Sequence, residues 1–60
     1  MKFKVGDKVK IARAIFDTAN TNKAHFVGKT RVVKNVLLNK YVLEDIDFLW
    51  LADELELVED

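Results

Sequence analysis

The sequence predicts an all-β domain built from five short strands. Polar and apolar residues alternate with a period of two over residues 8–13 and again over residues 55–58. Such alternation is typical of strands with one buried face. Residues that favour turns separate the apolar segments in the middle of the chain. The expected strands cover residues 8–14, 29–36, 40–45, 47–51 and 55–58.

The first expected strand, residues 8–14, follows a turn at residues 5–7, where a glycine and an aspartate favour a change of direction. The period of two places Val9 and Ile11 on the buried face and the lysines beside them on the outer face. This strand is therefore half-buried and basic on its outer side.

Residues 16–25 form the longest segment without strand character. Their Asn, Asp and Thr side chains bond to nearby backbone groups and favour turns. We expect a solvated loop or one short helical turn here, with a binding loop as the alternative, because long loops in compact domains often carry function. Phe16 and Phe26 bracket the segment and are expected to hold its ends on the core.

Gly28 allows the sharp turn that leads into the second expected strand. Val32 and Val33 are adjacent in this strand and interrupt the alternation. Two interpretations account for them: a β-bulge, or a strand that is apolar on both faces.

Asn39 and Lys40 lie between two apolar segments and predict a tight hairpin, with Asn39 tolerating the left-handed conformation. A second turn at residues 45–47 precedes the fourth strand. Residues 52–54 are too few for a stable helix and predict one 3-10 turn before the last strand. A helix over residues 43–58 is the alternative, but the Asp-X-Asp turn and the aromatic run within it argue against a helix.

The chain has 60 residues, which form a single domain, 1–60, with a small core. A domain of this size buries only about 60% of the surface that its unfolded chain exposes. The sequence contains no cysteine, which excludes disulfides and thiolate metal sites. No apolar run approaches the ~18 residues of a membrane span, and no signal-peptide pattern is present. We therefore expect a soluble, cytoplasmic protein that does not contact membranes.

Charge is segregated along the chain although the net charge is zero. Residues 1–40 contain all ten basic residues and two acidic ones, a balance of +8, whereas residues 41–60 contain eight acidic residues and no basic one, a balance of −8. Such segregation can mark a basic binding face. It also arises where the two halves pair within one sheet and opposite charges face each other across strands, and this is the interpretation that we favour.

The sequence offers no constellation of catalytic residues. Serine and cysteine are absent, so the common nucleophiles are missing. His25 is the only histidine and is expected at the surface; with Asp17 it would supply two metal ligands, which do not make a convincing site. Asp45 and Asp47 lack the glycine and distal glutamate of a calcium loop and are interpreted as a turn. We expect no enzyme activity, no cofactor and no bound metal.

Three segments resemble parts of SH3-like barrels. Residues 5–11, Val-Gly-Asp-Lys-Val-Lys-Ile, resemble the opening of many bacterial and phage SH3-like domains. Residues 27–33, Val-Gly-Lys-Thr-Arg-Val-Val, are similar to the glycine-centred core of the KOW motif of ribosomal and transcription proteins. Residues 49–58 resemble the way in which such domains close. The resemblance implies a small five-stranded SH3-like barrel with a one-turn 3-10 link before the last strand.

The resemblance leaves the function open. Arg31 stands where the KOW pattern usually has a second glycine, so nucleic-acid binding does not carry over to this chain by similarity alone. SH3-like barrels also serve peptide binding, subunit docking and electron-transfer complexes. The function must therefore be argued from the surface of this particular chain.

Two functions fit the sequence. The first is a non-catalytic interaction module that docks on a protein partner or on itself, because a small core cannot cover all the apolar residues near residue 50 and exposed apolar area usually marks a partner surface. The candidate interface residues are Ile46, Phe48, Leu49, Trp50 and Leu51. Some of these apolar residues, considered together with Leu37 and Leu38, are expected to lie exposed at the surface. The alternative is a KOW-like module that binds RNA or DNA weakly. Its candidate contacts are Lys23, Lys29, Arg31, Lys34 and Lys40.

Overall fold

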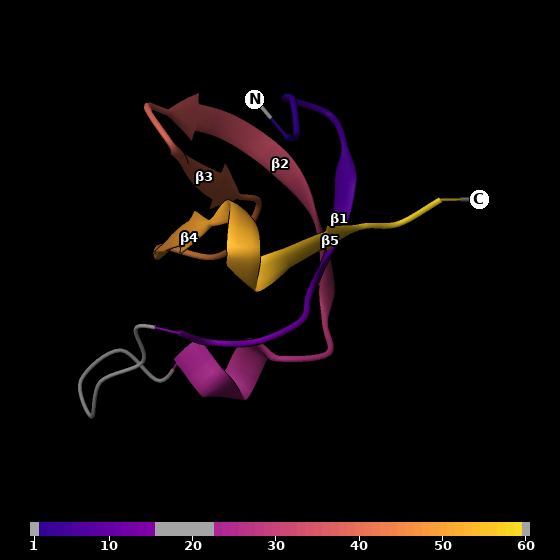
Figure 1. Ribbon diagram of the computed structural model, residues 1–60, viewed down its shortest axis with the longest axis vertical. Helices are drawn as coiled ribbons and strands as arrows, with labels where there is room; N and C mark the ends of the chain where they lie inside the picture. Colours follow the sequence, from indigo (N-terminus) through magenta and orange to yellow (C-terminus); the bar gives the residue numbers. More distant parts are fainter. Residues whose placement is uncertain (1, 16–22, 60) are drawn as a thin grey trace.

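The computed structural model describes residues 2–15 and 23–59, which form an all-β fold of five antiparallel strands and two 3-10 turns (Figure 1). The strands are β1 (Lys8–Ile11), β2 (Thr30–Leu37), β3 (Lys40–Leu43), β4 (Leu49–Leu51) and β5 (Leu55–Leu57). The 3-10 turns are η1 (Lys23–Phe26) and η2 (Ala52–Glu54). The predicted all-β class, the number of strands and the 3-10 link before the last strand are confirmed, and no α-helix forms over residues 43–58. The expected helical turn in the long segment is η1, while Phe16 lies outside the described residues.

The five strands belong to one sheet with the order β4-β3-β2-β1-β5. The central strand β2 is the longest, and it pairs with β1 through its first residues and with β3 through its last. Figure 1 shows β2 as a long arched strand that spans the molecule from the η1 side to the β2–β3 hairpin. Within the described residues β4 and β5 are the two edges, so the sheet is unclosed and the predicted barrel is not completed by strand pairing.

A β-bulge interrupts the regular pairing of β2 with β3. Val33 lies opposite Leu43 and Asn35 lies opposite Val42, so Lys34 is an additional residue with no counterpart on β3. Such an insertion bends a strand and increases its twist. The bulge follows the adjacent valines and does not separate them. Val33 is buried, whereas Val32 lies opposite Lys8 on the outer face and is half-buried, so the strand also carries apolar residues on both faces. Both interpretations of this strand therefore hold in part.

The β2–β3 hairpin has a two-residue turn at Leu38 and Asn39, because Leu37 pairs with Lys40. Leu38 has the positive φ, 53°, and its side chain is 93% exposed. The expectation that Asn39 adopts the left-handed conformation was wrong. The register of the strands places the turn one residue earlier than the turn preference of Asn39 suggests. A leucine therefore has a positive φ, a conformation that residues other than glycine rarely adopt.

The core lies inside the bend of the sheet and receives inward side chains from all five strands. Its buried apolar members are Phe3, Val9, Ile11, Val33, Tyr41, Leu43, Ile46, Trp50 and Leu55. Trp50 is fully buried, and the Phe26 ring from η1 lies edge-on to it at 6.4 Å. At the other end Tyr41 is edge-on to Phe3, and its hydroxyl oxygen accepts the Phe3 N–H at 3.3 Å. Phe26 thus holds its end of the segment on the core, as the sequence predicted.

The basic first strand and the acidic last strand are neighbours, as the sequence predicted. β1 pairs antiparallel with β5, and Lys10 lies directly opposite Glu56. The guanidinium of Arg13 is 4.0 Å from the Glu56 carboxylate, and both side chains are more than half exposed. Charge segregation along the chain therefore becomes, in part, cross-strand charge pairing on the outer face of the sheet.

Reversing Glu56 to Lys tests this pairing. The substitution replaces attraction to Lys10 and Arg13 by repulsion and should lower the free energy of unfolding by about 1 kcal/mol, because exposed pairs each contribute roughly 0.2–1 kcal/mol. Urea unfolding at low and high salt should show a larger loss at low salt, since screening weakens surface charge interactions. Glu44→Lys in the β3–β4 turn is the control. A loss that is independent of salt would contradict an electrostatic origin.

Replacing Trp50 by Ala tests the core. Truncating a buried tryptophan costs roughly 3–5 kcal/mol, which is comparable to the whole stability of a domain of this size. Trp50→Ala should therefore be largely unfolded by circular dichroism. Trp50→Phe, which keeps an aromatic ring and removes an indole N–H that has no partner within the described residues, should remain folded. A folded Ala variant would mean that the core does not depend on this ring.

Candidate functional site

The structure divides the predicted interface residues between the core and the surface. Ile46 and Trp50 are buried, with exposed fractions of 3% and 0%, and they present no surface to a partner. Leu49 is exposed, and Phe48 and Leu51 are half-buried. The physical reason is the alternation along β4, which directs Trp50 into the core and its two neighbours outward.

Apolar side chains gather on the outward face of β2, β3 and β4. Residues directly opposite one another on paired strands share a face, and one row across these strands runs from Leu37 through Lys40 to Leu51. In the adjacent row Val42 lies opposite Leu49. We call the four apolar residues, with Lys40 among them, the leucine face. Two of its leucines, Leu37 on β2 and Leu49 on β4, are close to half exposed.

The predicted nucleic-acid contacts do not converge on one face. Lys23 is buried, with 6% of its surface exposed. Lys40 lies on the outward leucine face, whereas Arg31 lies opposite Val9, whose side chain is on the buried face of the sheet. The exposed Lys29 holds its ammonium 5.5 Å from the Phe26 ring, at the start of β2. The exposed Lys34 is the additional residue of the bulge. The basic residues are therefore distributed around the sheet.

The described residues that were considered for metal or acid–base chemistry form no metal-binding group. His25 is exposed in η1 and stacks edge-on against Phe26 at 5.7 Å. Asp45 and Asp47 are exposed in the link between β3 and β4, and Asp17 lies outside the described residues. Over residues 2–15 and 23–59, no group of three His, Cys, Asp or Glu side chains is arranged to hold a metal ion. In the same residues, no helix is long and apolar enough to cross a membrane.

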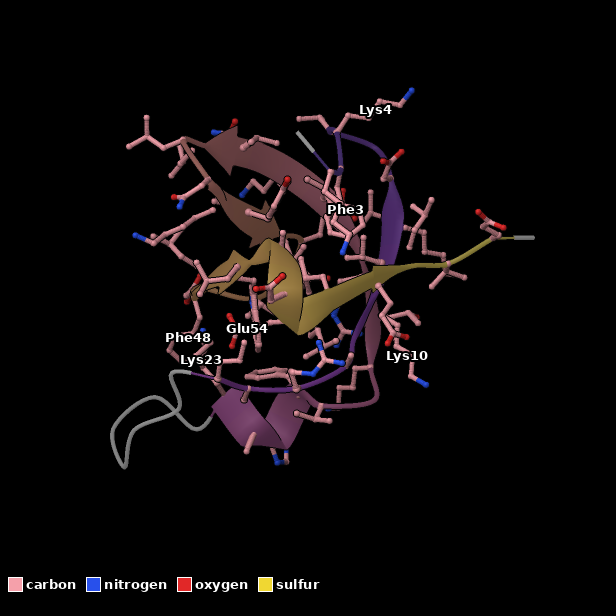
Figure 2. All side chains as sticks on the ribbon, viewed as in Figure 1. Phe3, Lys4, Lys10, Lys23, Phe48 and Glu54 are labelled. Atoms are coloured by element: carbon pink, nitrogen blue, oxygen red, sulfur yellow. The ribbon has the colours of Figure 1, made fainter. Side chains whose placement is uncertain are left out.

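A buried ion pair joins Lys23 to Glu54, and sequence reasoning missed it. Figure 2 shows the two side chains close together beneath β4 and η2. The Lys23 ammonium lies 3.3 Å from the Glu54 carboxylate and 4.4 Å from the centre of the Trp50 ring. Glu54 is 0% exposed, and its second oxygen accepts the Ile15 N–H at 2.8 Å. The carboxylate therefore connects η1, η2 and the segment after β1.

The same ion pair occupies the free edge of β4. The Leu51 N–H donates to Glu54 at 2.9 Å, and the Leu49 carbonyl accepts from the Lys23 ammonium at 2.9 Å. These two backbone groups lie on either side of Trp50, which pairs with β3. An additional strand at this edge would form its hydrogen bonds with the same two groups. Side chains fill both positions, so the edge of β4 is closed to another strand. The one sequence signal was the glutamate three residues after Leu51, the spacing of a capping box.

A surface groove of about 750 Å³ lies on the other side of the molecule, between the N-terminal segment, β2 and β5. It is lined by Lys2, Phe3, Lys4, Val5, Asp7, Asn35, Val36 and Leu57. Phe3, Val36 and Leu57 supply apolar side chains, and two lysines contribute positive charge. Sequence reasoning missed this groove because its walls come from three segments that are distant along the chain.

Comparison of the chain with protein-family models, with curated proteins and with solved structures gave no match.

Breaking the buried ion pair tests its structural role. Removing one partner of a buried pair leaves an uncompensated charge and typically costs 3–5 kcal/mol, so Lys23→Met should largely unfold the domain. The double variant Lys23→Met/Glu54→Gln removes both charges and should recover part of that loss, which urea unfolding would measure. Arg13→Ala breaks the exposed pair with Glu56 and should cost less than about 1 kcal/mol. Equal losses at both sites would contradict a special role for the buried pair.

Proposed function

We propose that this chain is a non-catalytic protein-interaction module with an SH3-like architecture, which docks on a protein partner through the leucine face. The architecture is supported by the strand order β4-β3-β2-β1-β5, by a long β2 shared between two pairings, and by a 3-10 turn between the last two strands. These features agree with the sequence resemblance to SH3-like barrels. The function rests on the surface of the sheet, because fold alone does not determine function.

The observation that carries the proposal is the exposure of leucines that lie on neighbouring strands, on one face of the sheet. Leu37 and Leu49 are 47% and 44% exposed, and Leu38 at the adjoining hairpin is 93% exposed. A 60-residue domain needs its apolar residues in the core. Exposed apolar side chains gathered on neighbouring strands therefore indicate a surface that a partner covers.

The leucine face also indicates the chemistry of its partner. Lys40 lies between Leu37 and Leu51 in one cross-strand row, so apolar residues flank it on both neighbouring strands. A partner that buries these leucines must also offer an acidic or carbonyl group to this lysine, because an unpaired buried charge is costly. The partner surface is therefore expected to be apolar with an acidic residue near its centre.

Nucleic-acid binding has weaker support. Lys23 is held by Glu54, and Arg31 and Lys40 lie on opposite faces of the sheet. Phosphate binding gains strength from several cations that meet the backbone together. The net charge of zero adds no long-range attraction.

Site-specific photo-crosslinking tests the proposal. A benzophenone amino acid at Leu49 should crosslink a specific protein in cells, whereas the same group at Lys8 on the outward face of β1 should not. The captured protein, once purified, should bind the wild-type chain in calorimetry. Leu49→Asp should weaken that binding about tenfold through the lost apolar burial. Leu57→Asp is the control, because Leu57 has similar exposure but lies on the opposite edge strand.

Two results would contradict the proposal. One is equal binding by the wild-type chain and the Leu49→Asp variant. The other is sub-micromolar binding of DNA or RNA oligonucleotides at 150 mM salt, measured by fluorescence anisotropy and lost in Lys29→Ala, because non-specific binding is ordinarily no tighter than about 10⁻⁶ M. That second result would make the chain a nucleic-acid module. Sedimentation of the wild-type chain alone would show whether the partner is a second copy.

A further inference from the structure

The two edges of the sheet differ in whether they can accept another strand. The edge at β4 is filled by the side chains of Lys23 and Glu54. At β5 no side chain of the described residues fills the edge in this way, and the hydrogen bonds between β5 and β1 show which backbone groups of β5 are already paired. The Ala12 N–H donates to the Glu54 carbonyl at 2.8 Å, and the Val58 N–H donates to the Lys8 carbonyl at 2.9 Å. β1 thus binds every second residue of this segment.

The alternation of an antiparallel ladder then directs the backbone groups of Leu57 away from β1. The preceding inward residue, Leu55, donates its N–H to the Ala52 carbonyl. Leu57 therefore presents its N–H and C=O at an edge where no other strand of the described residues pairs. One residue of an added strand can exchange two hydrogen bonds with Leu57.

The groove lies beside this open edge, because the Leu57 side chain lines it. The buried Phe3 and Val36 of β2 also line the groove. Figure 2 shows Phe3 pointing into the molecule and Lys4 extending outward from the same segment. A volume of about 750 Å³ is within the range of ordinary ligand sites.

The charges at the rim favour an acidic occupant. Lys2 and Lys4 are both exposed, and the Lys2 ammonium lies 5.7 Å from the Phe3 ring. The acidic residue of the groove, Asp7, accepts the Lys4 N–H at 3.1 Å and so belongs to the turn before β1. Glu56 lies on the outer face opposite Lys10. The positive charge at the rim is therefore available to a ligand.

We infer that the edge of β5 accepts an extended segment of another protein as a sixth strand, with one apolar side chain in the groove and acidic side chains beside Lys2 and Lys4. Strand addition of this kind takes its affinity from backbone hydrogen bonds and its specificity from pockets for alternate side chains. The site is separate from the leucine face and does not depend on it.

Peptide selection on the full 60-residue chain tests the inference. A phage-displayed library of 12-residue peptides should yield ligands that contain one apolar residue flanked by Asp or Glu. Synthetic peptides with the selected sequences should protect the Leu57 amide from hydrogen exchange. N-methylation along such a peptide should abolish binding at alternate positions only, because one of every two N–H groups in an antiparallel strand faces its neighbour. Docking through side chains alone would not produce this alternation.

Substitutions separate this site from the leucine face. Leu57→Lys should abolish peptide binding, and Lys4→Glu should weaken it about two- to tenfold, as expected for reversal of an exposed charge. Leu37→Lys is the matched control, because Leu37 and Leu57 are equally exposed at 47%. Leu37→Lys should leave peptide binding unchanged while impairing the partner of the leucine face, so failure of one site is distinguishable from failure of the other.

Three outcomes would overturn the inference. The first is a library that yields no ligand or ligands without acidic residues. The second is a selected peptide whose affinity is unchanged by Leu57→Lys or whose N-methyl scan shows no alternation. The third is sedimentation of the wild-type chain as a dimer that Leu57→Lys dissociates, which would assign this edge to self-pairing.

Discussion

The buried contact between Lys23 and Glu54 is the constraint on which the arrangement of this small sheet depends. Glu54 occupies the link between the two edge strands, β4 and β5, which do not pair with each other within the described residues. Its carboxylate accepts from Lys23 of η1, from the Ile15 N–H after β1 and from the Leu51 N–H of β4. Desolvating two charges is costly unless their hydrogen bonds are made. Here those bonds hold the elements around the opening between β4 and β5. In a closed barrel, strand pairing would hold them.

This contact also makes the two edges of the sheet unequal. Exposed strand edges promote unspecific pairing, and proteins commonly block them with charges. The Lys23 ammonium and the Glu54 carboxylate meet the backbone groups of β4 directly, whereas Leu57 of β5 keeps its backbone groups open beside a groove. Side chains therefore protect the edge at β4, and the edge at β5 is the one proposed to accept another strand. The leucine face, on the outward side of the protected half, is the separate surface through which protein docking is proposed.

The sequence predicted those features that follow from local periodicity. Val9 and Ile11 are buried because alternate residues of a strand face opposite sides. Features that depend on distant partners were not predictable in the same way. Lys23 lies in a polar segment, and its burial requires a carboxylate 31 residues later. The positive φ of Leu38 results from pairing register, which overrides the preference of Asn39. Ile46 is buried in a turn that lacks strand alternation, so its position in the core had no periodic signal.

The placement of charge is the further ground on which we propose a protein partner and not a nucleic acid. In the described residues, Glu54 and Glu56 are the acidic groups in ion pairs. Glu54 lies in the link between β4 and β5, and Glu56 lies on the outer face of β5. The lysines at the groove and in the leucine face stand instead among apolar side chains. A phosphate backbone would neutralise such a lysine and leave the neighbouring leucines in water. An acidic and apolar protein surface would pair with the lysine and would also bury the leucines, which adds about 25 cal/mol for each Å² of apolar surface removed from water.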